Sequence, residues 1–166
     1  MRRLTGDYPG AARDLEEALG IHRDLGDRLG QANALTCLGR VRRLTGDYPG
    51  AAGELEEAMG IYRDIGERGG EAESVNEAGT LHRVRGDLAR AGSCHRQAVS
   101  LARQIGSSWD EAQALAGLGR CALAAGHTAK AEHRLRQALE IFRRTGAAEA
   151  AEVSAELEAL TDARSV

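Results

Sequence analysis

Apolar residues recur along this chain at helical spacing, in stretches of about 18 residues, and all but the last of these stretches end at a glycine. Between residues 27 and 66 there are two such stretches, and Gly46 and Gly66 end them. Asp47 is a suitable N-cap for the second stretch, and Pro49 follows in its first turn, where a missing N–H costs least. The pattern predicts a pair of antiparallel helices, which we name helix A and helix B. Over the whole chain we expect helices at about 8–25, 28–45, 48–65, 70–85, 88–105, 109–125, 128–145 and 147–161.

The helix pair repeats every 40 residues. Residues 2–12 are identical to residues 42–52, and 17 of the 20 residues in 2–21 match those in 42–61. A fixed period of this length indicates an all-α stack of repeats in place of one closed core. We expect a partial repeat at 1–26 (the end of a helix A plus a helix B), repeats at 27–66, 67–106 and 107–146, and a capping helix and tail at 147–166.

Small residues mark the points where helices should meet closely. Gly39, Gly79 and Gly119 occupy equivalent places in the middle of the three helices A. A glycine inside a helix costs about 0.5–1 kcal/mol relative to alanine. Its recurrence predicts a close helix contact that offsets this cost. His95 stands where the equivalent residues are leucines (Leu15, Leu55 and Leu135), so we expect a buried polar side chain with a depressed pKa.

The repeat resembles the tetratricopeptide repeat family. The resemblance rests on Leu38-Gly39, Gly46, Ala51, Leu55 and Ala58, and on the same pattern from Leu118-Gly119 to Ala138. The middle repeat departs from it at Ala78 and His95. The 40-residue length is similar to the repeats of kinesin light chains and bacterial regulators. The resemblance implies a right-handed superhelical solenoid of antiparallel helix pairs, whose helices A line a concave face.

Composition excludes several classes of function. The net charge of −3 argues against a nucleic-acid binder, and no apolar run approaches the roughly 18 residues that span a membrane. The cysteines (Cys37, Cys94 and Cys121) form no CxxC pair and the histidines no HExxH motif, so we expect no metal, no cofactor and no enzyme activity. The start of the chain has no signal-peptide pattern, and we expect a cytoplasmic protein. A metal or thiol enzyme is the weakest reading.

The resemblance implies that a partner binds on the helices A. The side of each helix A opposite its apolar face predicts the contact residues Asn33, Thr36, Cys37, Arg40, Arg43, Glu73, Asn76, Glu77, Thr80, Arg83, Gln113 and Arg120. Four of these are arginines and two are glutamates, which favours an acidic or carboxylate-terminated protein or peptide. The alternative is that Glu73 and Glu77 neutralise the arginines by pairing with Arg40.

These observations predict a non-enzymatic scaffold for protein–protein interaction. The alternative is a sensory or regulatory module of a larger bacterial regulator with an ATPase or DNA-binding output domain. Helix 8–25 lacks a helix A partner, so its apolar residues Leu15, Ala18 and Leu19 should be uncovered and available for self-association.

Two further features predict local structure. Ser108 and Glu111 have the spacing of a capping box at the start of a helix. Val153, Leu157 and Leu160 form an apolar stripe on the last helix.

Overall fold

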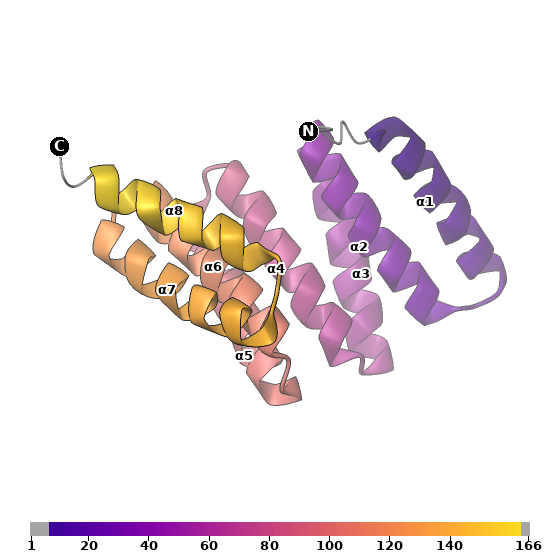
Figure 1. Ribbon diagram of the computed structural model, residues 1–166. Coiled ribbons are helices and arrows are strands. Elements are labelled where there is room, and N and C mark those ends of the chain that lie inside the picture. Colours follow the sequence, from indigo (N-terminus) through magenta and orange to yellow (C-terminus); the bar gives the residue numbers. More distant parts are fainter. Residues whose placement is uncertain (1–6, 164–166) are drawn as a thin grey trace. The chain divides into compact units, whose positions relative to one another are not determined.

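The structure, a computed structural model, describes residues 7–163, which contain eight α-helices and no strand. Their bounds are α1 (Tyr8–Asp24), α2 (Arg28–Thr45), α3 (Tyr48–Ile65), α4 (Arg68–Val84), α5 (Leu88–Ile105), α6 (Ser108–Ala124), α7 (Thr128–Thr145) and α8 (Glu149–Ala163) (Figure 1). Every helix lies within two residues of its predicted bounds. The helices A are α2, α4 and α6, and the helices B are α1, α3, α5 and α7. The expected helical turn before residue 6 lies outside the described residues.

The helix ends follow the chemistry that the sequence predicts, with one shift. The Asp47 carboxylate accepts a hydrogen bond from the Gly50 N–H at 3.0 Å and caps α3. Gly46 and Gly66 end α2 and α3 in the left-handed region, with φ of 88° and 73°. The N-cap of α6 is Ser107 and not Ser108, because the Ser107 hydroxyl accepts from the N–H three residues later. The expected capping box was therefore placed one residue too late.

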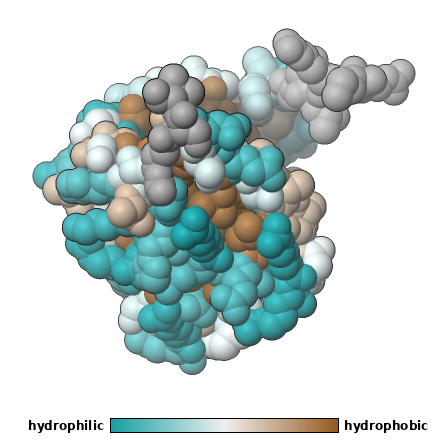
Figure 2. Space-filling model, turned by 60° about the vertical axis from the view of Figure 1, so that its left-hand side comes forward, coloured by the Kyte–Doolittle hydropathy of each residue, from teal (hydrophilic) through white to brown (hydrophobic). Residues whose placement is uncertain are grey.

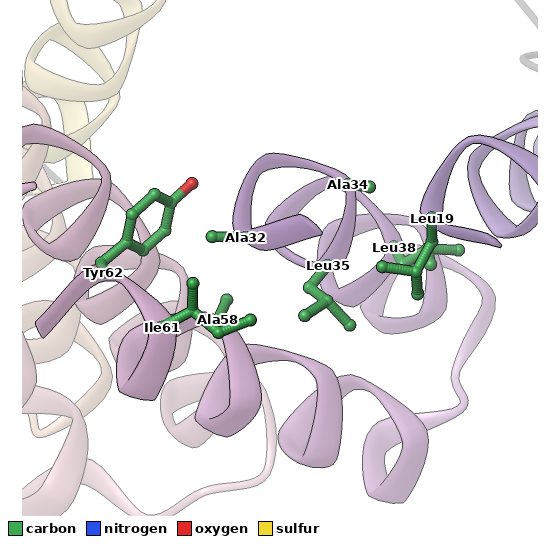
Figure 3. Close-up of a cluster of buried hydrophobic side chains, with 8 residues drawn as sticks. All are labelled: Leu19, Ala32, Ala34, Leu35, Leu38, Ala58, Ile61 and Tyr62. Carbon is green, nitrogen blue, oxygen red and sulfur yellow. The ribbon is translucent and has the colours of Figure 1, made fainter. Parts of the chain in front are cut away.

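The chain divides inside α4 into two compact units, residues 1–77 and 78–166. In the first unit, α2 packs against both α1 and α3. Figure 3 shows the core between them, where α1 contributes Leu19, α2 contributes Leu35 and Leu38, and α3 contributes Ile61 and Tyr62. In the second unit, α6 packs against α5 and α7, and α7 packs against α8. Two of the helices A, α2 and α6, thus each lie between two helices B within one unit.

Glycines sit where helix A meets helix B, as the sequence predicts. A Cβ added to Gly39 would lie 2.7 Å from Leu55 Cγ and 3.3 Å from the Ala51 carbonyl oxygen. A Cβ added to Gly119 would lie 2.8 Å from Leu135 Cγ, in the same arrangement. Real Cβ atoms do not approach other carbon atoms this closely, so the contact requires glycine.

His95 occupies the corresponding slot in the second unit and is fully buried, as predicted. Two glycines make room for its imidazole: a Cβ at Gly79 would lie 2.8 Å from His95 Cε1, and one at Gly117 would lie 2.4 Å from it. Burial, with a smaller contribution from the positive charges of Arg83 and Arg120, lowers the His95 pKa to about 4.

The apolar face of α1 is covered in part, which corrects the expectation that it is bare. Leu19 is only 7% exposed and lies against α2 (Figure 3). Leu15 and Ala18 remain half-buried, whereas Leu55 and Ala58, their equivalents in α3, are buried. Leu15 and Ala18 line an open groove between α1 and α2, so this groove is the part left open.

The surface of the described residues is mostly polar. Figure 2 shows one face on which polar side chains surround a smaller area of exposed apolar side chains. No helix among residues 7–163 is long and apolar enough to span a membrane. On α8, Val153 and Leu160 are buried and Leu157 is half-buried, so the predicted apolar stripe faces the protein.

Candidate functional site

In the middle of α2, one narrow stripe of residues reaches the solvent. Neighbouring helices pack on both sides of α2 and bury most of its first three turns. Asn33 and Cys37 are exposed and the Arg40 side chain is 39% exposed. These three residues are spaced by four and three positions, which places them on one face of the helix. They are three of the predicted contact residues, and we call them the α2 stripe.

Thr36 is a correction to the predicted contact set. It is 2% exposed, and its hydroxyl donates a hydrogen bond to the Ala32 carbonyl oxygen at 3.0 Å. It also lies 3.5 Å from the Tyr62 hydroxyl, which donates to the Asn33 side-chain oxygen at 2.7 Å. Thr36 therefore belongs to the core. It immediately precedes Cys37 in the sequence, and its side chain lies on the buried side of α2 and not on the exposed side. Tyr62, which the sequence analysis did not select, orients Asn33.

The arginines of the first unit are paired within the protein. Arg40 lies 2.7 Å from a Glu73 carboxylate oxygen and 3.0 Å from one of Glu77. Arg43 lies 3.3 Å from the other oxygen of Glu77. Burial by itself would lower the Arg40 pKa, but Glu77 and Glu73 outweigh it and raise the pKa. The alternative considered from sequence, neutralisation by Glu73 and Glu77, describes this cluster, which we call the Arg40 cluster.

The second unit repeats this pairing with α8 as the partner. Arg120, the repeat equivalent of Arg40, lies 2.9 Å from a Glu152 oxygen and 2.5 Å from a Glu156 oxygen. Gln113 donates to Glu149 at 3.2 Å, and Trp109 donates to the same carboxylate at 3.3 Å. The α8 glutamates therefore line the predicted contact residues of α6.

The remaining predicted contact residues are half-buried: Asn76, Thr80 and Arg83 on α4. When the ion-pair partners within each unit are included, the predicted excess of positive charge on the helices A disappears. In the first unit, Arg40 and Arg43 are balanced by Glu73 and Glu77. In the second, Arg120 carries two glutamates of α8 that the sequence analysis did not include. The Arg40 cluster is thus neutral, and Arg120 with its two glutamates carries a net charge of −1.

The chemistry of Cys37 does not match that of an activated nucleophile. Burial raises the pKa of its thiol, and the nearby Arg40 offsets this only in part. The protonated thiol therefore predominates at neutral pH. Among residues 7–163, no group of three or more His, Cys, Asp or Glu side chains is arranged to hold a metal ion.

Comparisons with known proteins agree on the kind of repeat. Residues 71–144 match the family model of the tetratricopeptide repeat. No curated protein sequence matches the chain. The crystal structure of BtubC (BKLC) from P. vanneervenii superposes with a TM-score of 0.77 at 19% identity, over 99% of this chain and 68% of that one.

A second solved structure is similar over most of both chains. It is a Podosopora anserina protein assigned as a kinesin light chain, with nearly identical TPR-like repeats. It superposes with a TM-score of 0.70 at 19% identity, over 96% of this chain and 80% of that one. Identity this low shows a shared fold alone. Residues 71–144 therefore match the tetratricopeptide repeat family, and the superpositions show that the fold of such repeat arrays extends over nearly all of this chain, as its sequence predicts.

Proposed function

We propose that this chain is a protein-binding scaffold that takes up a partner segment along the exposed side of its helices A. Tetratricopeptide repeats in general mediate protein–protein interaction, and residues 71–144 match that family. The concave groove that the family resemblance implies is lined by the same helices. The partner is a protein or peptide segment, and the predicted preference is for an acidic or carboxylate-terminated one.

The observation that carries this proposal is the α2 stripe. Asn33, Cys37 and Arg40 reach the solvent from the middle of α2, where every other residue from 30 to 39 is buried. Asn33 is held by the Tyr62 hydroxyl, and Arg40 is held by two carboxylates, so both side chains are ordered before a partner arrives. Pre-ordered polar groups lower the entropy cost of binding.

The Arg40 cluster sets the charge preference of this surface. A partner carboxylate gains a pair with Arg40 only by displacing Glu73 or Glu77. We therefore expect weak binding of acidic peptides by the unmodified protein, with loss of affinity as salt rises. Removing the two competing carboxylates should expose the guanidinium groups to the partner.

Replacing both glutamates tests the proposal: Glu73→Gln with Glu77→Gln should strengthen binding of an acidic peptide about tenfold, the equivalent of about 1.4 kcal/mol. Cys37 reports where binding occurs, because a fluorophore on its exposed thiol lies on the α2 stripe. Cys94 and Cys121 are replaced by alanine so that only Cys37 carries the label. Titration with the peptide at two salt concentrations then gives the affinity at this site.

Two controls make the result specific. Asp64→Asn removes a carboxylate that pairs with Arg28 at 3.2 Å on an exposed part of the first unit, and it should leave the titration unchanged. A label at Glu56→Cys, on the exposed side of α3, should give no response. An unchanged affinity in the double glutamine variant, or an equal response from both labels, would contradict the proposed site.

Self-association through α1 stays a prediction of the sequence. Leu15 and Ala18 are partly exposed, and Ile21 and Leu25 are 52% and 74% exposed. Leu15→Glu should lower the mass measured by light scattering at high protein concentration toward that of one chain. Leu123→Glu, at an apolar residue of α6 that is 40% exposed, serves as the control and should leave the mass unchanged. A single-chain mass for the unmodified protein would end this prediction.

A further inference from the structure

A second candidate surface lies on the helix B side of the second unit. It is a groove of about 550 Å³ between the first turns of α5 and α7, over the end of α6. Leu88, Leu118 and Ala122 form its apolar floor, and Arg96, Lys130 and Arg134 stand at its edges. None of its lining residues is acidic. We call it the basic groove.

The first unit contains the same groove 80 residues earlier, with different chemistry. Its lining includes Leu38, which is the repeat equivalent of Leu118. At the positions of Arg96, Ala122 and Arg134 it has Glu16, Arg42 and Glu54. The two grooves therefore differ at the residues that decide charge while sharing the helix framework.

In the first unit these three residues satisfy one another. Arg42 lies 3.2 Å from Glu16, 3.0 Å from Glu54 and 3.2 Å from Asp47. Leu38 beneath them is 0% exposed. This groove presents internally paired charges and no exposed apolar floor, so it offers little to a partner.

In the second unit the cations of the basic groove have no carboxylate partner among the described residues. Within residues 7–163, neither Arg96, Lys130 nor Arg134 forms an ion pair. Arg134 donates to the neutral Gln137 at 3.0 Å. With alanine at position 122 in place of the arginine, Leu118 is half-buried where Leu38 is fully buried. The result is a floor of apolar surface between unneutralised cations in a chain of net charge −3.

We propose that the basic groove binds an acidic protein segment that inserts one apolar side chain between α5 and α7. The cations supply charge complementarity to carboxylates on either side of that side chain. The floor supplies a site of the size and apolar character that buries an anchoring side chain. Arg96 and Lys130 are exposed, as are Ala125 and Ala129, so the groove is open and a segment can cross it. This surface is separate from the α2 stripe and does not depend on the function proposed for it.

The ligand requirements are tested with short peptides on the full chain. An acidic peptide with one central leucine should bind with micromolar affinity in a fluorescence anisotropy titration, and binding should weaken with salt. The same peptide with serine in place of leucine, and a basic peptide that keeps the leucine, should each bind at least tenfold more weakly. Equal binding of the serine peptide, or preference for the basic one, would overturn the proposal. Binding of dodecanoate without binding of the peptide would also overturn it.

The groove of the first unit supplies the residues for a variant that removes the charge and apolar surface of the basic groove. The triple change Arg96→Glu, Ala122→Arg and Arg134→Glu gives the basic groove the residues that already coexist around Arg42. The triple variant should fold, with an unchanged melting temperature by circular dichroism. Its affinity for the acidic leucine peptide should be at least tenfold lower. Retained affinity in a folded triple variant would refute the groove as the binding site.

The reverse set of substitutions, made in the first unit, should create a second binding site for the peptide. Glu16→Arg, Arg42→Ala and Glu54→Arg convert the first groove toward the basic one, and they should increase the number of peptides bound per chain. An unchanged stoichiometry in this folded variant counts against the proposal. The label at Cys37 separates the two surfaces: a peptide bound in the basic groove should not change its fluorescence, and Glu73→Gln with Glu77→Gln should leave its affinity unchanged. Failure at either surface is thus detected without reference to the other.

Discussion

Lowering the pH from 7 to 5 should destabilise the protein by about 2 kcal/mol through His95 alone. His95 is fully buried, and its folded pKa is about 4 against an unfolded value of 6.5. Below pH 6.5 the unfolded chain takes up a proton that the folded chain does not, so stability falls as the pH drops. The loss approaches its limit of about 3 kcal/mol as the pH falls below 4. Urea unfolding at a series of pH values measures it directly.

Other groups also titrate in this range, so the effect is isolated by substitution. His95→Leu should remove this part of the pH dependence. It should also stabilise the protein at pH 7 by roughly 1 kcal/mol, because leucine fills the equivalent slot at Leu55 and Leu135. A pH dependence that survives in His95→Leu would refute the assignment, and destabilisation at pH 7 would show that the imidazole makes a needed contact.

The burial of His95 could be predicted because the repeat supplies its own comparison. Leu15, Leu55 and Leu135 mark the position as part of the core, and Gly79 stands opposite it as Gly39 stands opposite Leu55. Helix bounds could be predicted for the same reason, since apolar spacing, aspartate caps and terminal glycines act within a single turn. Local rules of this kind hold whatever the neighbouring helix does.

The charge of the candidate site could not be predicted because it depends on helix register. Glu73 and Glu77 stand 33 and 37 residues after Arg40, but the glutamates paired with Arg120 stand 32 and 36 residues after it, at Glu152 and Glu156. A search at the repeat period misses them, because α8 does not keep the register of the helices A. One residue of register also decides that Thr36 is buried while Cys37 is exposed.

The basic groove, by contrast, leaves a signal in the sequence. Glu16, Arg42 and Glu54 change to Arg96, Ala122 and Arg134 at a separation of 80 residues. Each change alone is an ordinary surface substitution. They form a set only once the fold brings α5, α6 and α7 to one groove, as α1, α2 and α3 are brought together in the first unit.

The second large effect is expected from replacing the glycines at the helix crossings, which should lower the stability of the protein. Gly39→Ala should destabilise the first unit by about 1–2 kcal/mol, although alanine is the better helix former. The added methyl group would lie 2.7 Å from Leu55 Cγ and 3.3 Å from the Ala51 carbonyl oxygen, and the backbone oxygen cannot rotate away. Gly119→Ala meets Leu135 Cγ at 2.8 Å and the Ala131 carbonyl oxygen at 3.2 Å, so the same loss is expected.

Gly53→Ala is the matched control, because Gly53 lies inside α3 and a Cβ there meets no atom within 4 Å. This change should stabilise the protein by about 0.5–1 kcal/mol, since only the helix propensity differs. The double variant Gly39→Ala with Gly119→Ala should lose about 3 kcal/mol, because the two sites share no contacting residue and their effects should add. Urea denaturation of the four variants gives these values. Stabilisation by Gly39→Ala equal to that of Gly53→Ala would show that the helices separate without cost, and close packing would then not be the reason for glycine at the crossing.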